Sequence, residues 1–108
     1  MIPYPVNLPE SLKESWDRLA PVLEEMGTLR EVDAEALARY LLLCNEYAHI
    51  TAATVSAIKG NDVDTVKDWL TMQAKLSQQL AEYEDRFGLT AESRKKNGWI
   101  VPKKMQNA

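Results

Sequence analysis

The feature that most constrains the fold is a long amphipathic segment in the middle of the chain, residues 31–59. Its apolar positions recur at alternating intervals of three and four residues, which is the spacing of one face of an α-helix. This first apolar row consists of Ala34, Leu37, Leu41, Cys44, Ala48, Thr51, Val55 and Ile58. A helix of this length would extend for about 43 Å at 1.5 Å per residue, so we predict that it is the central element of a helical protein.

A second apolar row lies beside the first one on the same predicted helix. It consists of Tyr40, Leu43, Tyr47 and Ile50, whereas the outer row is more polar. The two rows together make an apolar surface that is wide enough to contact two neighbouring helices. We therefore predict that the helix packs against other copies of the chain and that the second row belongs to the oligomer or partner interface.

Helices are also predicted on both sides of this segment. Residues 10–26 carry a heptad-like apolar seam that follows a predicted capping box at Ser11 and Glu14. Pro21 lies inside this helix and is expected to kink or break it, because proline cannot donate to the carbonyl of Asp17. The link to the central helix is short, which predicts that the two helices are antiparallel neighbours.

The C-terminal third of the chain predicts one more long helix and one short helix. Residues 62–87 begin at a capping residue, Asn61 or Asp62, and residues 91–96 begin after Thr90. The seam of the long helix consists of Val66, Trp69, Gln73, Leu76, Leu80, Tyr83 and Phe87. No alternating strand pattern of useful length occurs. The predicted fold class is all-α, with residues 1–98 as a helical oligomerisation domain and residues 99–108 as a basic tail.

Length and composition narrow the class of protein. A chain of 108 residues predicts one domain. No apolar run approaches the roughly 18 residues of a membrane span, and the N-terminus lacks the pattern of a secretory signal. The single cysteine excludes an internal disulfide and fits an intracellular setting.

Charge is distributed unevenly along the chain. Residues 1–90 contain 8 Lys and Arg against 15 Asp and Glu, a net charge of −7, whereas residues 91–108 contain 5 against 1, a net charge of +4. An acidic body with a basic end is typical of proteins that have an anionic partner. The candidate phosphate contacts are Arg94, Lys95, Lys96, Lys103 and Lys104. The alternative is a solubilising C-terminus that binds nothing, and Trp99 either folds back or anchors a partner.

No residues predict catalysis, a metal site or a cofactor. Asp62 and Asp64 are spaced like the start of a calcium loop, but Lys67 and Gln73 replace its required Gly and Glu, so helix capping is the better interpretation. His49 and Cys44 lie five residues apart and do not share a helix face, which argues against a zinc site. We therefore predict a protein that is not an enzyme.

Several motifs, in their order along the chain, resemble the phage terminase small subunits, an all-helical family of tailed phages and prophages. The residues Phe87, Gly88, Leu89, Thr90, Ala91, Ser93 and Arg94 resemble the closing motif of that family, Phe-Gly-Leu-Thr-Pro-x-x-Arg. The earlier matching positions are Trp16, Leu19, Pro21, Leu23, Gly27, Leu29, Asp33, Leu37, Cys44 and Tyr47. The resemblance extends over most of the chain, from Trp16 to Arg94.

The resemblance implies a subunit of the genome-packaging motor that has no catalytic activity of its own. Such proteins form rings, bind viral double-stranded DNA, and regulate the large subunit, which carries the ATPase and the nuclease, in the host cell cytoplasm. A ring would also bring together the basic tails of many chains. Two alternatives remain open from the residues alone: a helical adaptor that binds proteins through Trp99 and the tail, and a small regulatory subunit of an enzyme.

Overall fold

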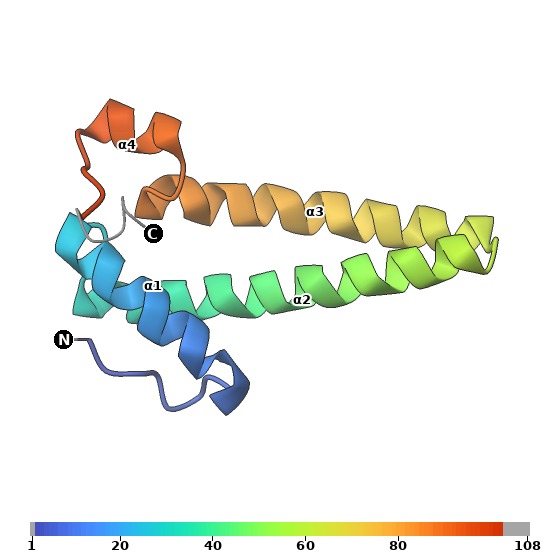
Figure 1. Ribbon diagram of the computed structural model, residues 1–108, viewed down its shortest axis with the longest axis horizontal. Helices are drawn as coiled ribbons and strands as arrows, with labels where there is room; N and C mark the ends of the chain where they lie inside the picture. Colours follow the sequence, from blue (N-terminus) through green and yellow to red (C-terminus); the bar gives the residue numbers. More distant parts are fainter. Residues whose placement is uncertain (1, 103–108) are drawn as a thin grey trace.

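The computed structural model describes residues 2–102 and is built on a long antiparallel helical hairpin (Figure 1). The hairpin consists of α2 (Ala34–Lys59) and α3 (Val63–Phe87), and α1 (Lys13–Met26) crosses the first turns of α2. Short 3₁₀ turns, η1 (Glu10–Leu12) and η2 (Glu31–Asp33), precede α1 and α2, and α4 (Ala91–Asn97) follows α3. The predicted all-α fold with three main helices and a short fourth helix is confirmed.

The molecule has three parts, which we name by their residues. The head comprises residues 2–46 and 80–102, and it contains α1, α4 and one end of the hairpin. The shaft comprises residues 47–58 and 69–79, and the tip comprises residues 59–68. Principal extents of 46 × 32 × 26 Å reflect the projection of the shaft and tip away from the head (Figure 1).

The hydrophobic core lies in the head. Leu23 and Leu37 are fully buried there, and Trp16 is only 2 % exposed. The core is shared by the N-terminal arm, α1, α2 and the end of α3, and its buried residues are Ile2, Leu8, Leu12, Trp16, Ala20, Leu23, Leu29, Leu37, Tyr40, Leu41, Leu80 and Phe87. Because α1 and the head ends of α2 and α3 contribute to one cluster, the head anchors the otherwise isolated shaft.

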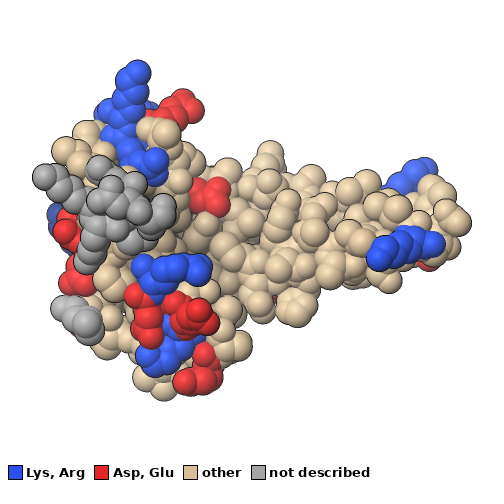
Figure 2. Space-filling model, in the orientation of Figure 1, with Lys and Arg blue, Asp and Glu red and all other residues tan. Residues whose placement is uncertain are grey.

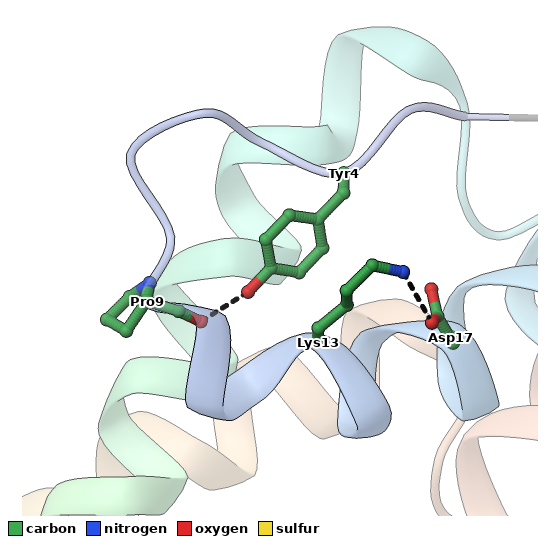
Figure 3. A network of polar contacts seen from close by, with 4 residues as sticks. All are labelled: Tyr4, Pro9, Lys13 and Asp17. Carbon is green, nitrogen blue, oxygen red and sulfur yellow. Dashed lines mark hydrogen bonds and ion pairs between the residues drawn. The ribbon is translucent and has the colours of Figure 1, made fainter.

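The N-terminal arm, residues 2–9, packs against α1 (Figure 3). The Tyr4 ring meets the Trp16 ring edge to face at a centroid distance of 5.8 Å, and its hydroxyl donates to the carbonyl of Pro9. Lys13 lies over the Tyr4 ring and forms an ion pair with Asp17 at 2.8 Å. These contacts hold the proline-rich arm over one side of the core.

One prediction about α1 is narrowed and another is wrong. The helix continues through Pro21, so the expected break does not occur, whereas a kink there stays a prediction. Pro21 lies on the exposed side, and the buried Trp16, Ala20 and Leu23 hold both halves of the helix in the core. The capping box at Ser11 and Glu14 does not form. The chain enters α1 through η1 instead, where the backbone N–H of Leu12 bonds to the Pro9 carbonyl.

The tip turns the chain between the two long helices. Of the two predicted capping residues, Asn61 and Asp62, it is Asp62 that caps α3. Its carboxylate accepts hydrogen bonds from the backbone N–H and the hydroxyl of Thr65. These hydrogen bonds hold the pKa of Asp62 below its ordinary value. Asn61, rather than the preceding glycine, takes the left-handed conformation that closes the turn. Within residues 2–102, no helix is both long and apolar enough to cross a membrane.

Candidate DNA-binding and self-association surfaces

The cations of α4 form one candidate surface on the head. Thr90 caps this helix by accepting from the backbone N–H of Ser93 at 3.1 Å. Lys95 and Lys96 lie in its last turn with exposed side chains. Figure 2 shows basic side chains at the α4 end of the head, with acidic atoms beside them. The structure therefore presents two of the predicted phosphate contacts to solvent.

The other predicted phosphate contacts have different positions. Arg94 is half-buried, and its Nη1 donates to the carbonyl of Gly88 at 2.9 Å. Lys103 and Lys104 lie outside the described residues. The assignment of all five cations to DNA binding stays a prediction.

Trp99 folds back onto the head. A Cβ atom on Gly88 would lie 2.7 Å from Trp99 Cε3, so the indole ring covers this glycine closely. Gly88 has a φ of +75° at the end of α3, a left-handed conformation that glycine adopts without strain. The sequence left open whether Trp99 folds back or anchors a partner, and the described chain shows the first arrangement. A contact with a partner stays a prediction.

The shaft is a second candidate surface, because it is almost free of charge. Residues 47–58 contain no Lys, Arg, Asp or Glu, and Lys75 is the single one in residues 69–79. Figure 2 shows the resulting uncharged stretch between the head and the basic side chains of the tip. The large apolar side chains exposed here are Val55 at 46 %, Ile58 at 56 %, Leu70 at 49 % and Met72 at 47 %.

A groove runs between the two helices on one side of the shaft. Its apolar floor is formed by Ile50, Met72 and Leu76, and its volume is about 520 Å³. Glu46, His49, Lys75 and Gln79 complete its lining. Two helices alone have no third layer to cover such a face, so apolar surface stays exposed along the shaft.

The predicted interface row of α2 lies between the two helices of the hairpin. Tyr40 and Ile50 are buried within the chain, and Leu43 and Tyr47 are half-buried. Tyr40 reaches α3, where its hydroxyl donates to Glu84 at 2.8 Å and its ring lies beside that of Tyr83. Whether any residue of this row also contacts another copy stays a prediction.

Polar contacts add to the apolar packing of α2 against α3. Burial and the hydrogen bond with Glu84 raise the pKa of Tyr40 far above its ordinary value. Burial also raises the pKa of Cys44, which keeps the thiol protonated and weakly nucleophilic at neutral pH. Farther along the hairpin, Gln73 donates to the Thr51 hydroxyl at 2.8 Å. These bonds hold the register of the hairpin.

Removing the Tyr40 hydroxyl will test this arrangement. We expect Tyr40→Phe to lower the free energy of unfolding by about 1–2 kcal/mol, because the half-buried Glu84 carboxylate loses its donor. Tyr83→Phe is the matched control, since the Tyr83 hydroxyl accepts only a 3.3 Å bond from the exposed Arg39; we expect a loss below about 0.5 kcal/mol. Urea denaturation followed by circular dichroism measures both, and equal losses would contradict the assignment.

The described residues 2–102 contain no group of three or more His, Cys, Asp or Glu side chains that is arranged as a metal site. Asp62 is engaged in capping α3, which agrees with the sequence interpretation of that residue. The predicted lack of catalytic residues and cofactors stays a prediction.

Comparison with known protein families decides the affiliation of the chain. A family profile described as the phage terminase small subunit matches residues 13–102, which includes all four α-helices. The chain belongs to the phage terminase small subunit family. Comparisons with curated proteins and with solved structures gave no match.

Membership of the terminase small subunit family gives the chain a general role in phage packaging and confirms the resemblance. The structure also shows what the closing motif does locally. It ends α3 at Gly88 and begins α4 at Thr90, and the hydroxyl of Ser93 donates to the carbonyl of Asp85. Sequence reasoning missed the role of Ser93 and the exposed Leu70 and Met72 of the shaft. The long uncharged run of the shaft is the sequence pattern that could have revealed these two exposed residues.

Proposed function

We propose that this terminase small subunit assembles into a closed ring, binds viral double-stranded DNA, and regulates the large subunit without being an enzyme itself. It would act in the host cell cytoplasm, where the genome is packaged. The observation that carries the proposal is the uncharged, apolar shaft, which projects from a well-packed head in a chain of this family.

Self-association follows from the geometry of the shaft. Within the described residues, each helix of the hairpin has only the other helix as a neighbour there, and large apolar side chains remain about half exposed. Contiguous apolar surface of this kind is typical of protein interfaces. A contact between two different faces of the shaft repeats from copy to copy and closes into a ring when the rotation allows it.

DNA binding is supported by the charge distribution. The exposed Lys95 and Lys96 lie on a short helix that is fixed to the head, while the body of the chain is acidic. One such pair binds phosphate weakly. A ring would present one pair from every copy, and simultaneous contacts raise the overall affinity without any new type of contact.

The assembly is tested by native mass spectrometry of the full chain, with and without double-stranded DNA. We expect one closed oligomer of several chains and an additional species that carries DNA. A monomer at high protein concentration would refute the ring, whereas an oligomer that never retains DNA would favour the adaptor function. Regulation is measured separately, as a change in the ATPase rate of the large subunit when this chain is added.

The salt dependence of DNA binding tests the cations. We expect replacement of Lys95, Lys96, Lys103 and Lys104 by alanine to weaken binding and to flatten the plot of log affinity against log salt concentration. Each lost phosphate contact lowers the slope by about 0.9 in B-DNA. The control variant replaces Lys59 and Lys67, two exposed cations of the tip, by alanine, and its salt slope should stay unchanged. An unchanged slope in the fourfold variant would remove the tail from the DNA contact.

A further inference from the structure

We propose that Arg94 is a positioning residue that fixes α4 to the end of α3, and that it is not a phosphate contact. The inference rests on the proposed DNA binding and divides the basic cluster into two roles. Lys95 and Lys96 meet the DNA, whereas Arg94 and Ser93 hold the helix that carries them.

The hydrogen bonds of Arg94 connect it to its own chain on both sides. Its Nη1 donates to the carbonyl of Gly88 at 2.9 Å, and its backbone carbonyl accepts from the N–H of Trp99 at 2.9 Å. Carbonyl groups in the last turn of a helix lack helical partners, and the negative end of the helix dipole attracts a cation. Gly88 follows the last residue of α3, so the guanidinium ties α4 to the residue that ends α3 and lies near the negative end of the α3 dipole.

Ser93 makes the same connection one residue earlier. It is 1 % exposed, and its hydroxyl donates to the carbonyl of Asp85 in the last turn of α3. Trp99 completes the junction by covering Gly88 with its ring. Three residues after Thr90 thus contact the end of α3, and together they orient α4 on the head: Ser93, Arg94 and Trp99.

Lys95 and Lys96 differ from Arg94 in this respect. Both side chains are exposed, and neither makes a hydrogen bond or ion pair with residues 2–102. A cation that is free in the unbound chain can neutralise a phosphate and so release counterions that were condensed on the DNA. Holding such cations in a fixed arrangement favours binding, because less conformational freedom is lost on contact with DNA.

The test compares three variants of the full chain, Arg94→Ala, Ser93→Ala and Lys95→Ala, for DNA affinity over a range of salt concentrations. We expect Arg94→Ala to weaken binding about three- to tenfold at fixed salt with an unchanged salt slope. Ser93→Ala alters no charge and should act in the same direction with a smaller effect. Lys95→Ala should lower the slope by about 0.9 for each chain that touches the DNA.

Fluorine NMR of 5-fluorotryptophan protein reports the junction independently of DNA. The chain has three tryptophans, and the signal of Trp99 is assigned with Trp99→Phe. Arg94→Ala and Ser93→Ala should shift this signal towards that of an exposed tryptophan and leave those of Trp16 and Trp69 in place. Lys95→Ala should move none of them. If Arg94→Ala shifts all three signals because the head unfolds, Ser93→Ala decides the question.

Three results overturn the inference. The first is a salt slope in Arg94→Ala that falls as it does in Lys95→Ala. The second is a DNA affinity that neither Arg94→Ala nor Ser93→Ala changes, and the third is a Trp99 signal that stays in place in both of these variants. Wild-type protein that binds no DNA would instead refute the proposed function, and the fluorine signals would still show whether Arg94 holds the junction.

Discussion

Replacing Leu37 by alanine will lower the free energy of unfolding by about 3 kcal/mol. Leu37 lies in the first turns of α2 and is fully buried in the core of the head. The substitution removes buried methyl groups and leaves a cavity that the surrounding helices fill only in part, and such changes cost about 2–5 kcal/mol. For a domain whose total stability is of the order of 5–15 kcal/mol, this is a large share.

Leu42→Ala is the matched control for this prediction. Leu42 lies on the same helix, the residue types are the same, and its side chain is 39 % exposed. We expect a loss below about 1 kcal/mol, because less apolar area returns to water and no enclosed cavity forms. Both variants are measured by urea denaturation at one protein concentration, since assembly adds to the apparent stability. Similar losses at the two positions would contradict the core described here.

A single acidic residue on the shaft will break the oligomer that we propose. We expect Val55→Glu to weaken self-association at least about a hundredfold, because a carboxylate without a partner would have to leave water at the interface. Val55 is 46 % exposed in the single chain, so a glutamate fits there without disturbing the head. Light scattering after size-exclusion chromatography, with native mass spectrometry, measures the shift from oligomer to monomer.

Val32→Glu gives the control for Val55→Glu. Val32 is 85 % exposed in the η2 turn of the head, away from the shaft, and the same change of side chain should leave the oligomer intact. Circular dichroism verifies that both variants keep their helices. An oligomer that survives Val55→Glu but dissociates with Val32→Glu would place the interface on the head instead.

The sequence predicted the helices and most of their ends, because these depend on neighbours along the chain. Thr90 and Asp62 accept hydrogen bonds from N–H groups three residues ahead, a local geometry that residue type largely dictates. The apolar seam of α3 could also be predicted from the sequence, and Leu76, Leu80 and Phe87 of that seam are buried. The closing motif is likewise a local pattern of residue types, so the sequence alone was enough to point to the family.

The candidate site was predicted only in part. Lys95 and Lys96 are exposed as a solvent-facing basic cluster requires, but nothing in the charge pattern distinguished them from Arg94. That distinction depends on Gly88, six residues earlier, whose carbonyl comes within reach only when α4 turns back over the end of α3. The residue type shows that a side chain is charged, whereas the hydrogen-bond partner of that side chain depends on the path of the folded chain.

Sequence alone determined that Leu37, Ala48 and Val55 share one face of a helix, because helical periodicity is a property of local geometry. It did not determine which of them is covered. Leu37 is buried, whereas Ala48 and Val55 are exposed, because α1 and the arm cover only the first turns of α2. Only the tertiary structure decided where the head ends and the uncovered shaft begins, since burial depends on segments that are distant in sequence.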